Sequence, residues 1–175
     1  TSTFNDVALL TKTIGGTTNT SNGGNVFNND VTFTHNGTGQ WSLGSSPSGD
    51  DYNGNVNYLR MNTGLLSMAS TNTSTFAGNI STVGSSSNPL IATVSSGIAE
   101  LDGNINQIIM GDIALTPDFG NLRINKSGGD VTLAVPINIT SDINLTSGIM
   151  NTDATNLLIV NNGATRTGGS DASHV

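Results

Sequence analysis

The 175-residue chain has few of the residues that favour helices: one Glu, two Lys, three Arg and two Gln. Asn, Thr, Ser and Gly instead make up 90 of its residues. Because good helix formers are so scarce, an α-helical domain, or one that alternates strands and helices, is close to excluded. Apolar residues form 34% of the chain and are spread along it, which is not typical of disordered segments. Composition therefore predicts an ordered, polar, β-rich protein.

Cysteine is absent, which excludes disulfides and thiolate metal sites. Five cationic side chains stand against twelve acidic ones, and this net charge of −7 would repel phosphate backbones and anionic membranes. No apolar run approaches the roughly 20 residues of a membrane-spanning helix, and the N-terminal residues lack a signal-peptide pattern. We therefore expect no nucleic-acid partner and no membrane insertion. We also expect the chain to belong to a longer protein that continues on both sides.

A short pattern recurs along the chain: a bulky residue, small polar residues, Asp or Asn, then an aliphatic residue. The Asp or Asn before the aliphatic residue recurs at intervals of 24, 25, 24 and 25 residues, at Asp6, Asp30, Asn55, Asn79 and Asn104. A period of this length is typical of solenoids, propellers and repeat arrays. Since a four-stranded propeller blade needs about 40 residues, this period predicts one coil of a right-handed parallel β-helix.

Each period contains short alternating runs that predict strands of a few residues, separated by polar turns. The second run of each period is predicted at Trp41–Leu43, Leu65–Met68, Leu90–Val94 and Ile113–Leu115. We predict a single all-β domain over 1–175, with regular repeats over 4–118 and tighter coils over 119–175. It would hold roughly seven coils and be about 34 Å long. A separate small β unit beginning near residue 119 is the alternative.

Stacked coils place equivalent side chains in ladders, and two of these are predicted to be apolar. One follows the bulky residues Phe27, Tyr52, Phe76 and Leu101, and the other the aliphatic residues Val31, Val56, Ile80 and Ile105. The Asn markers 55, 79 and 104 are candidates for an amide ladder at a turn, where Asn also tolerates the left-handed conformation. The neighbouring Gly54, Gly78 and Gly103 are expected to supply the positive φ that bends each coil.

Catalysis by a β-helix would need clustered carboxylates, or basic residues beside a bound cation. The one adjacent acidic pair, Asp50 and Asp51, is read as part of a polar turn. Its convergence with Arg60 in one cleft would argue for an enzyme. The Lys and Arg residues show no common coil position in the sequence, and His35 and His174 are read as surface or turn residues. We expect no enzyme activity.

Oxygen ligands at Asp51, Asn53 and Asn55 form a weak candidate calcium site, but the repeat already explains both Asn residues. We therefore expect no metal and no other cofactor. Ice binding would need a regular array of Thr-x-Thr pairs that orders water. The Thr-x-Thr pairs of this chain do not follow the coil period, so they form no such array. The single Trp41 either stacks on a sugar from the surface or fills the coil, and its alternation with Leu43 favours the interior.

The segments Thr11–Phe27, Phe27–Phe33 and Ser147–Ser170 resemble repeat regions of very large secreted surface proteins of gliding-type Gram-negative bacteria. Those proteins are adhesin-like and are usually exported by type IX secretion. The resemblance implies a non-catalytic structural or adhesive segment, secreted to the cell surface or an extracellular filament. Its implied partners are neighbouring coils of the same chain or filament, and surface polysaccharide. The alternative function is a carbohydrate-binding or polysaccharide-lyase-like β-helix.

Overall fold

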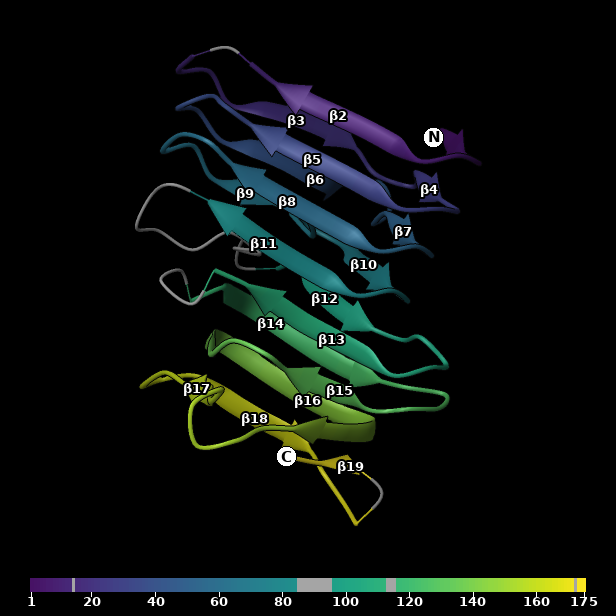
Figure 1. The fold of residues 1–175 in the computed structure, drawn as a ribbon, viewed down its shortest axis with the longest axis vertical. Helices are drawn as coiled ribbons and strands as arrows, with labels where there is room; N and C mark the ends of the chain where they lie inside the picture. Colours follow the sequence, from purple (N-terminus) through teal and green to yellow (C-terminus); the bar gives the residue numbers. More distant parts are fainter. Residues whose placement is uncertain (14, 85–95, 113–115, 172) are drawn as a thin grey trace.

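The computed structural model describes residues 1–175 except 14, 85–95, 113–115 and 172, and the described part is all-β with no helix. Short parallel strands stack along one axis into a β-solenoid, with the two termini at opposite ends (Figure 1). The predicted fold class is therefore confirmed. The strands predicted at residues 90–94 and 113–115 lie outside the described residues.

The described strands lie on three faces, which we call A, B and C in the order in which the chain first meets them. Face A contains β1 (Thr3–Phe4), β4 (Val26–Phe27), β7 (Asp51–Tyr52), β10 (Thr73–Phe76), β12 (Ile98–Leu101) and β18 (Thr165–Gly168). Face B contains β2 (Ala8–Lys12), β5 (Val31–His35), β8 (Val56–Arg60), β11 (Ile80–Gly84), β13 (Gln107–Gly111), β15 (Val131–Leu133) and β19 (Ser173–His174). Face C contains β3 (Asn19–Asn22), β6 (Trp41–Ser45) and β9 (Leu66–Ser67).

Two long strands bend from face to face in the last coils. β14 (Asp118–Asn125) passes from the C position of its coil to face A, and β16 (Ile137–Asn151) runs through all three positions. β17 (Leu158–Val160) pairs with the start of β16. Since β12 pairs with β14 and β14 with β16, the parallel stack runs across residue 119 without a break.

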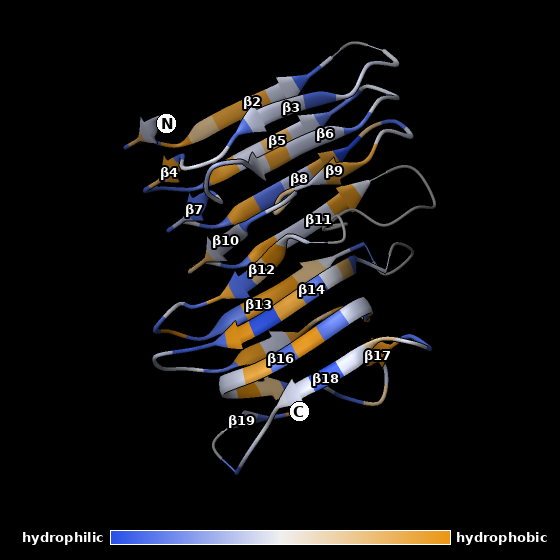
Figure 2. Ribbon diagram, turned by 180° about the vertical axis from the view of Figure 1, so that it is seen from behind, coloured by the Kyte–Doolittle hydropathy of each residue, from blue (hydrophilic) through white to orange (hydrophobic). Residues whose placement is uncertain are grey.

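In strands such as β5 and β8, bulky apolar residues alternate with small polar ones (Figure 2), so that one side of the strand is buried in the interior. In β5 and β8 the first, third and fifth residues are buried, while the second and fourth are only partly so. Thr, Asn and Ser at the outward positions suit a half-buried pleated surface.

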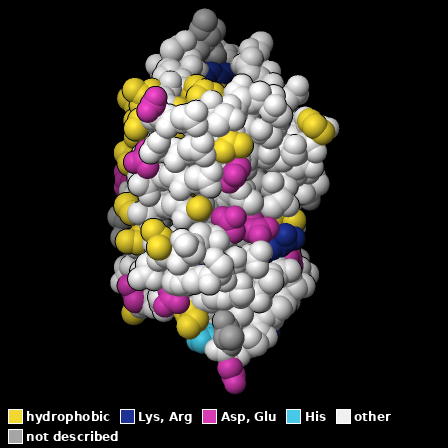
Figure 3. Space-filling view, turned by 90° about the vertical axis from the view of Figure 1, so that its right-hand side faces the viewer, with side chains coloured by type: hydrophobic (Ala, Val, Ile, Leu, Met, Phe, Trp, Pro, Cys, Tyr) yellow, Lys and Arg dark blue, Asp and Glu magenta, His cyan; other side chains and the backbone are white. Residues whose placement is uncertain are grey.

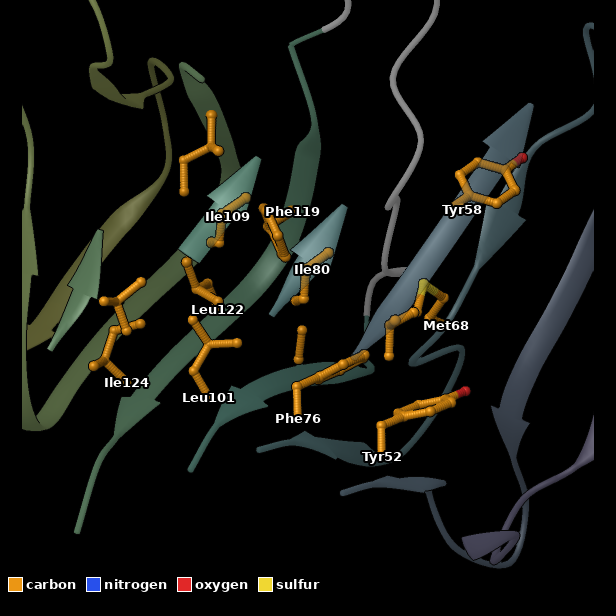
Figure 4. Close-up of a cluster of buried hydrophobic side chains, with 14 of the residues drawn as sticks. Tyr52, Tyr58, Met68, Phe76, Ile80, Leu101, Ile109, Phe119, Leu122 and Ile124 are labelled. Atoms are coloured by element: carbon orange, nitrogen blue, oxygen red, sulfur yellow. The ribbon is translucent and has the colours of Figure 1, made fainter. Parts of the chain in front are cut away.

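The bulky ladder of face A is confirmed and extends further than predicted. Phe4, Phe27, Tyr52 and Phe76 stack with ring centroids 4.7, 5.1 and 4.8 Å apart. The register then continues from Leu101 to Ile124 of β14, both labelled in Figure 4, and on to Leu145 of β16. Aromatic pairs of this kind contribute roughly 0.5–1.5 kcal/mol each beyond the burial of their area.

The aliphatic ladder of face B follows Val31, Val56 and Ile80, but the prediction that Ile105 continues it is wrong. Ile80 pairs with Ile109, and Ile105 is 66% exposed. A longer loop between β12 and β13 moves the next strand four residues along the sequence. The sequence spacing of the markers is therefore kept up to Asn104, although the side chain of Ile105 that follows it is exposed and does not point inward.

The predicted role of Gly54, Gly78 and Gly103 is also wrong, because none of them has a positive φ. A Cβ at Gly54 would lie 2.3 Å from the carbonyl carbon of Asn29 in the coil before. A Cβ at Gly78 would lie equally close to the carbonyl oxygen of Gly54. Glycine is needed at these corners because successive coils approach each other backbone to backbone.

Candidate functional site

Asp30, Asn55 and Asn79 form a ladder at the corner between faces A and B, which we call the corner ladder. Each side-chain Oδ1 accepts a backbone N–H from the next coil: Asn55 N lies 2.8 Å from Asp30 Oδ1, and Asn79 N lies 2.9 Å from Asn55 Oδ1. Asn79 Oδ1 in turn accepts from Ile108 N at 2.8 Å. These side chains replace ladder hydrogen bonds where the strands turn, which ties each coil to the next.

The predicted amide ladder thus has a different chemistry from the one expected. It runs from side chain to backbone, and no described non-glycine residue has a positive φ, so the left-handed Asn conformation is not used. Asn104 lies in the longer loop, and Asn106 instead accepts the N–H of Asp130 at 3.1 Å. Asp6 is an exposed residue at the corner of the first coil.

Asp50 is a buried structural carboxylate, 3% exposed, at the turn from face C to face A. Its Oδ1 accepts from the backbone and side-chain nitrogens of Asn25, at 3.0 and 2.8 Å, and its Oδ2 accepts from Gly44 N at 2.8 Å. Burial raises the pKa of Asp50, and these donors partly oppose that rise. The carboxylate therefore links its own turn, through Gly44, to the preceding coil, through Asn25.

Asp50, Asp51 and Arg60 are not brought together as a catalytic cluster. Asp51 Oδ1 accepts from Thr75 Oγ1 at 2.8 Å on the outside of face A. Arg60, at the far end of face B, donates to the carbonyl oxygens of Asn62 and Thr63. Of the pair interpreted as a polar turn, only Asp50 lies in a turn, where it is buried, whereas Asp51 begins β7.

Lys12, His35 and Arg60 occupy one inward position on three successive strands of face B, which we call the cation ladder. All three are buried, at 8%, 0% and 2% exposed. Lys12 Nζ donates to the carbonyl oxygens of Thr17 and Gln40, at 2.9 and 2.7 Å. Lys12 and Arg60 therefore satisfy backbone carbonyl oxygens of the turns between faces B and C.

The cation ladder overturns two expectations from the sequence. Basic residues do share a coil position, and His35 is a core residue, whereas His174 is exposed as predicted. The spacing of 23 and 25 residues from Lys12 to His35 to Arg60 matches the coil period and could have revealed the ladder. Burial and the positive charges of Lys12 and Arg60 lower the pKa of His35, which the carbonyl of Gly39 partly opposes.

The interior near the first coil holds a hollow of about 220 Å³. Phe4, Leu10 and Ser21 of the first coil line it together with Phe33 and Trp41 of the second. Trp41 is partly buried, and its ring packs edge-to-face on Phe33 with centroids 5.6 Å apart. It therefore serves the core, as its alternation with Leu43 predicted.

Polar side chains surround a shallow groove of about 210 Å³ on the outside of face A, which we call the face A groove. It spans three coils and is lined by Ser96, Ile98, Asn121, Leu122, Arg123, Asp142 and Asn144. Arg123 Nη1 forms an ion pair with Glu100 Oε2 at 2.8 Å, and Asn125 Nδ2 donates to Glu100 Oε1 at 2.7 Å. Acidic and basic side chains gather at mid-height in one side view (Figure 3).

The calcium candidates Asp51, Asn53 and Asn55 take part in hydrogen bonds between coils. Asn55 Oδ1 is used by the corner ladder, and Asn53 Nδ2 donates to Asn28 Oδ1 at 3.1 Å. Within the described ranges, no group of three His, Cys, Asp or Glu side chains is placed to hold a metal ion. Calcium binding, and the expected absence of cofactors, stay predictions.

Comparison with protein-family models, with curated proteins and with solved structures finds no match to this chain. The described residues contain no helix long and apolar enough to cross a membrane. The arrangement of the chain's own residues is therefore what bears on its function.

Proposed function

We propose that this chain is a non-catalytic structural and adhesive segment of a secreted bacterial cell-surface or extracellular filament protein. The observation that carries the proposal is the unbroken parallel pairing of strands from the first coil to the last. Every inner coil is held by hydrogen bonds on both sides, and the stack has one direction throughout. Such a quasi-one-dimensional scaffold suits a spacer that holds an extended shape.

The outer side of face A supports this role because it avoids stacked like charges. One outer ladder of face A reads Asp51, Thr75, Glu100, Arg123 and Asn144, so its two acids are separated by Thr and its Arg lies beside Glu. Like charges on adjacent strands are destabilising. The resemblance to adhesin-like repeat regions adds the bacterial surface and type IX export to the proposal.

Partners would join the solenoid at its two ends. In the described part of the chain, β1, β2 and β3 pair along one edge only, and β17, β18 and β19 pair only with β16. Unpaired edges of this kind are templates for further parallel strands. We propose that neighbouring coils of the same long chain or filament cover them.

The alternative function is a polysaccharide-lyase-like activity, and a turnover assay distinguishes it from the non-catalytic role. The purified chain, with and without calcium, is incubated with pectate, alginate, dextran and xylan, and reducing ends and unsaturated products are followed. The proposal expects no product above a heat-denatured control. Turnover that the Asp51→Asn variant abolishes, with unchanged folding, would overturn the non-catalytic assignment.

A further inference from the structure

We propose that the face A groove binds uncharged sugar units of a polysaccharide. The inference deepens the adhesive part of the proposed function and rests on it. The groove crosses β12, β14 and β16, and it presents Asn121, Arg123, Asp142 and Asn144 around the aliphatic side chain of Ile98. Its volume of about 210 Å³ is at the scale of one sugar ring.

The charges of the groove favour a neutral ligand. Arg123 contributes a positive charge on one side, and Asp142 contributes a negative one on the other. Glu100 already pairs with Arg123 from the coil above. An anion would meet Asp142 and Glu100, and a cation would meet Arg123, so either would lose by repulsion part of what it gained by attraction. A polyhydroxylated ligand instead both donates and accepts hydrogen bonds without carrying a charge.

The groove offers both kinds of hydrogen-bonding group in fixed positions. Asn144 Oδ1 accepts from Thr146 Oγ1 at 2.9 Å, which orients the amide so that its nitrogen can donate to a ligand. Asp142 supplies carboxylate oxygens, which Thr165 Oγ1 holds from the last coil. The Arg123 side chain is 33% exposed, and its ion pair with Glu100 holds the guanidinium in place.

The apolar part of the groove completes the match to a sugar. Ile98 offers a small hydrocarbon surface against which the C–H face of a ring can lie, while the polar groups around it meet the hydroxyls. Because all these residues project from hydrogen-bonded strands, little conformational entropy is lost when a ligand binds. Strands about 4.8 Å apart also repeat at nearly the length of one sugar unit.

The test is a titration of the ¹⁵N-labelled chain with uncharged hexasaccharides of glucose, mannose and xylose, and with hexagalacturonate as the charged comparison. We expect at least one uncharged hexasaccharide to shift the amide signals of residues 96–98, 121–123 and 142–144 in a saturable way. Asn144→Ala should weaken that binding about tenfold, which corresponds to about 1.4 kcal/mol. Asn57→Ala, a matched Asn on an outward position of face B, should leave it unchanged.

Three results would overturn the inference: no saturable shift with any uncharged sugar, shifts that lie outside the groove, or binding of hexagalacturonate alone. Equal weakening by Asn144→Ala and Asn57→Ala, with both variants folded, would also contradict it. The outcome is separable from that of the turnover assay. A sugar that binds in the groove and is cleaved would refute the non-catalytic assignment while leaving the groove's ligand class intact.

Discussion

His35 lies directly between Lys12 and Arg60 in the cation ladder, with its ring fully buried and its Nδ1 3.3 Å from the hydroxyl of Tyr58. A neutral imidazole separates the two cations, whereas a protonated one would add a third buried positive charge. Burial of the ring, together with the positive charges of Lys12 and Arg60, therefore lowers the pKa of His35 below its ordinary value of 6.5.

The lowered pKa of His35 predicts a loss of stability in mild acid. As pH falls below 6.5, the unfolded chain takes up a proton that folded His35 resists, so the free energy of unfolding decreases until the pH passes the folded pKa. Urea denaturation across this range measures the slope. Asp50 has the opposite effect on the free energy of unfolding. Because its pKa is raised in the folded state, the folded chain takes up the proton first as the pH falls, which stabilises it.

Two variants isolate the contribution of His35. His35→Phe removes the titrating group while keeping a ring beside Trp41, so the acid-dependent loss below pH 6.5 should shrink. His174→Asn removes the exposed histidine and should leave the slope as it is. A slope that His35→Phe does not change would show that other groups cause the acid sensitivity.

The corner ladder predicts unequal effects for two similar Asn residues. Asn79→Ala removes the acceptor of the Ile108 N–H and should lower the free energy of unfolding by about 1 kcal/mol. Asn104→Ala, in the longer loop outside the ladder, should change it by less than about 0.5 kcal/mol. Equal losses in urea denaturation would mean that the shared sequence motif, and not the hydrogen bond, determines the effect.

Close approach between coils predicts that Gly78→Ala is destabilising although its φ is compatible with alanine. The added Cβ meets the Gly54 carbonyl oxygen at 2.3 Å, so two backbones must separate at a cost of about 1–3 kcal/mol. Gly16→Ala meets nothing within 4 Å and should be nearly neutral. Thermal unfolding of both variants checks the contrast, and a stabilised Gly78→Ala chain would refute the packing explanation.

The sequence predicted the solenoid because bulky residues such as Phe27, Tyr52 and Phe76 hold one interior ladder and so must recur with the coil length. It failed at Ile105 because a loop of changed length preserves the marker spacing while moving the paired strand to Ile109. Contacts between coils explain the other errors. A glycine required by a neighbouring backbone looks the same in sequence as one required by its own φ.

The candidate sites were less predictable than the fold for a related reason. The Lys and Arg residues were expected to share no coil position and His35 to lie at the surface or in a turn, so the ladder of Lys12, His35 and Arg60 was not recognised. The face A groove depends on which outward residues of β12, β14 and β16 become neighbours. That relationship follows from the register of shortened coils and bulges between β14 and β16, and no fixed period predicts it.

The open ends predict head-to-tail association of the isolated chain. Leu158 and Val160 of β17 follow the buried residues Ile137 and Ile139 in register, yet Val160 is 43% exposed, and among the described strands β17 pairs with β16 alone. In a second copy, the hollow beside Ser21 lies at the opposite end and can receive such side chains. Because the two ends differ, this contact does not close into a dimer and extends into a filament.

Sedimentation over a range of concentrations measures this association. Val160→Lys places a charge on the open interior and should shift the chain towards monomer. Val83→Lys, at a residue 48% exposed on an outer strand position of face B, is the matched control and should not. Association that both variants weaken equally would indicate general stickiness in place of end-to-end stacking.

The central claim is that the chain serves at the bacterial surface, and immunogold electron microscopy of the source cells tests it most directly. Antibodies against the purified chain should label intact cells, or filaments that extend from them, without permeabilisation. Cells that lack the gene provide the control. Labelling that appears only after permeabilisation, with the interior of the cell as its location, would contradict the proposed function.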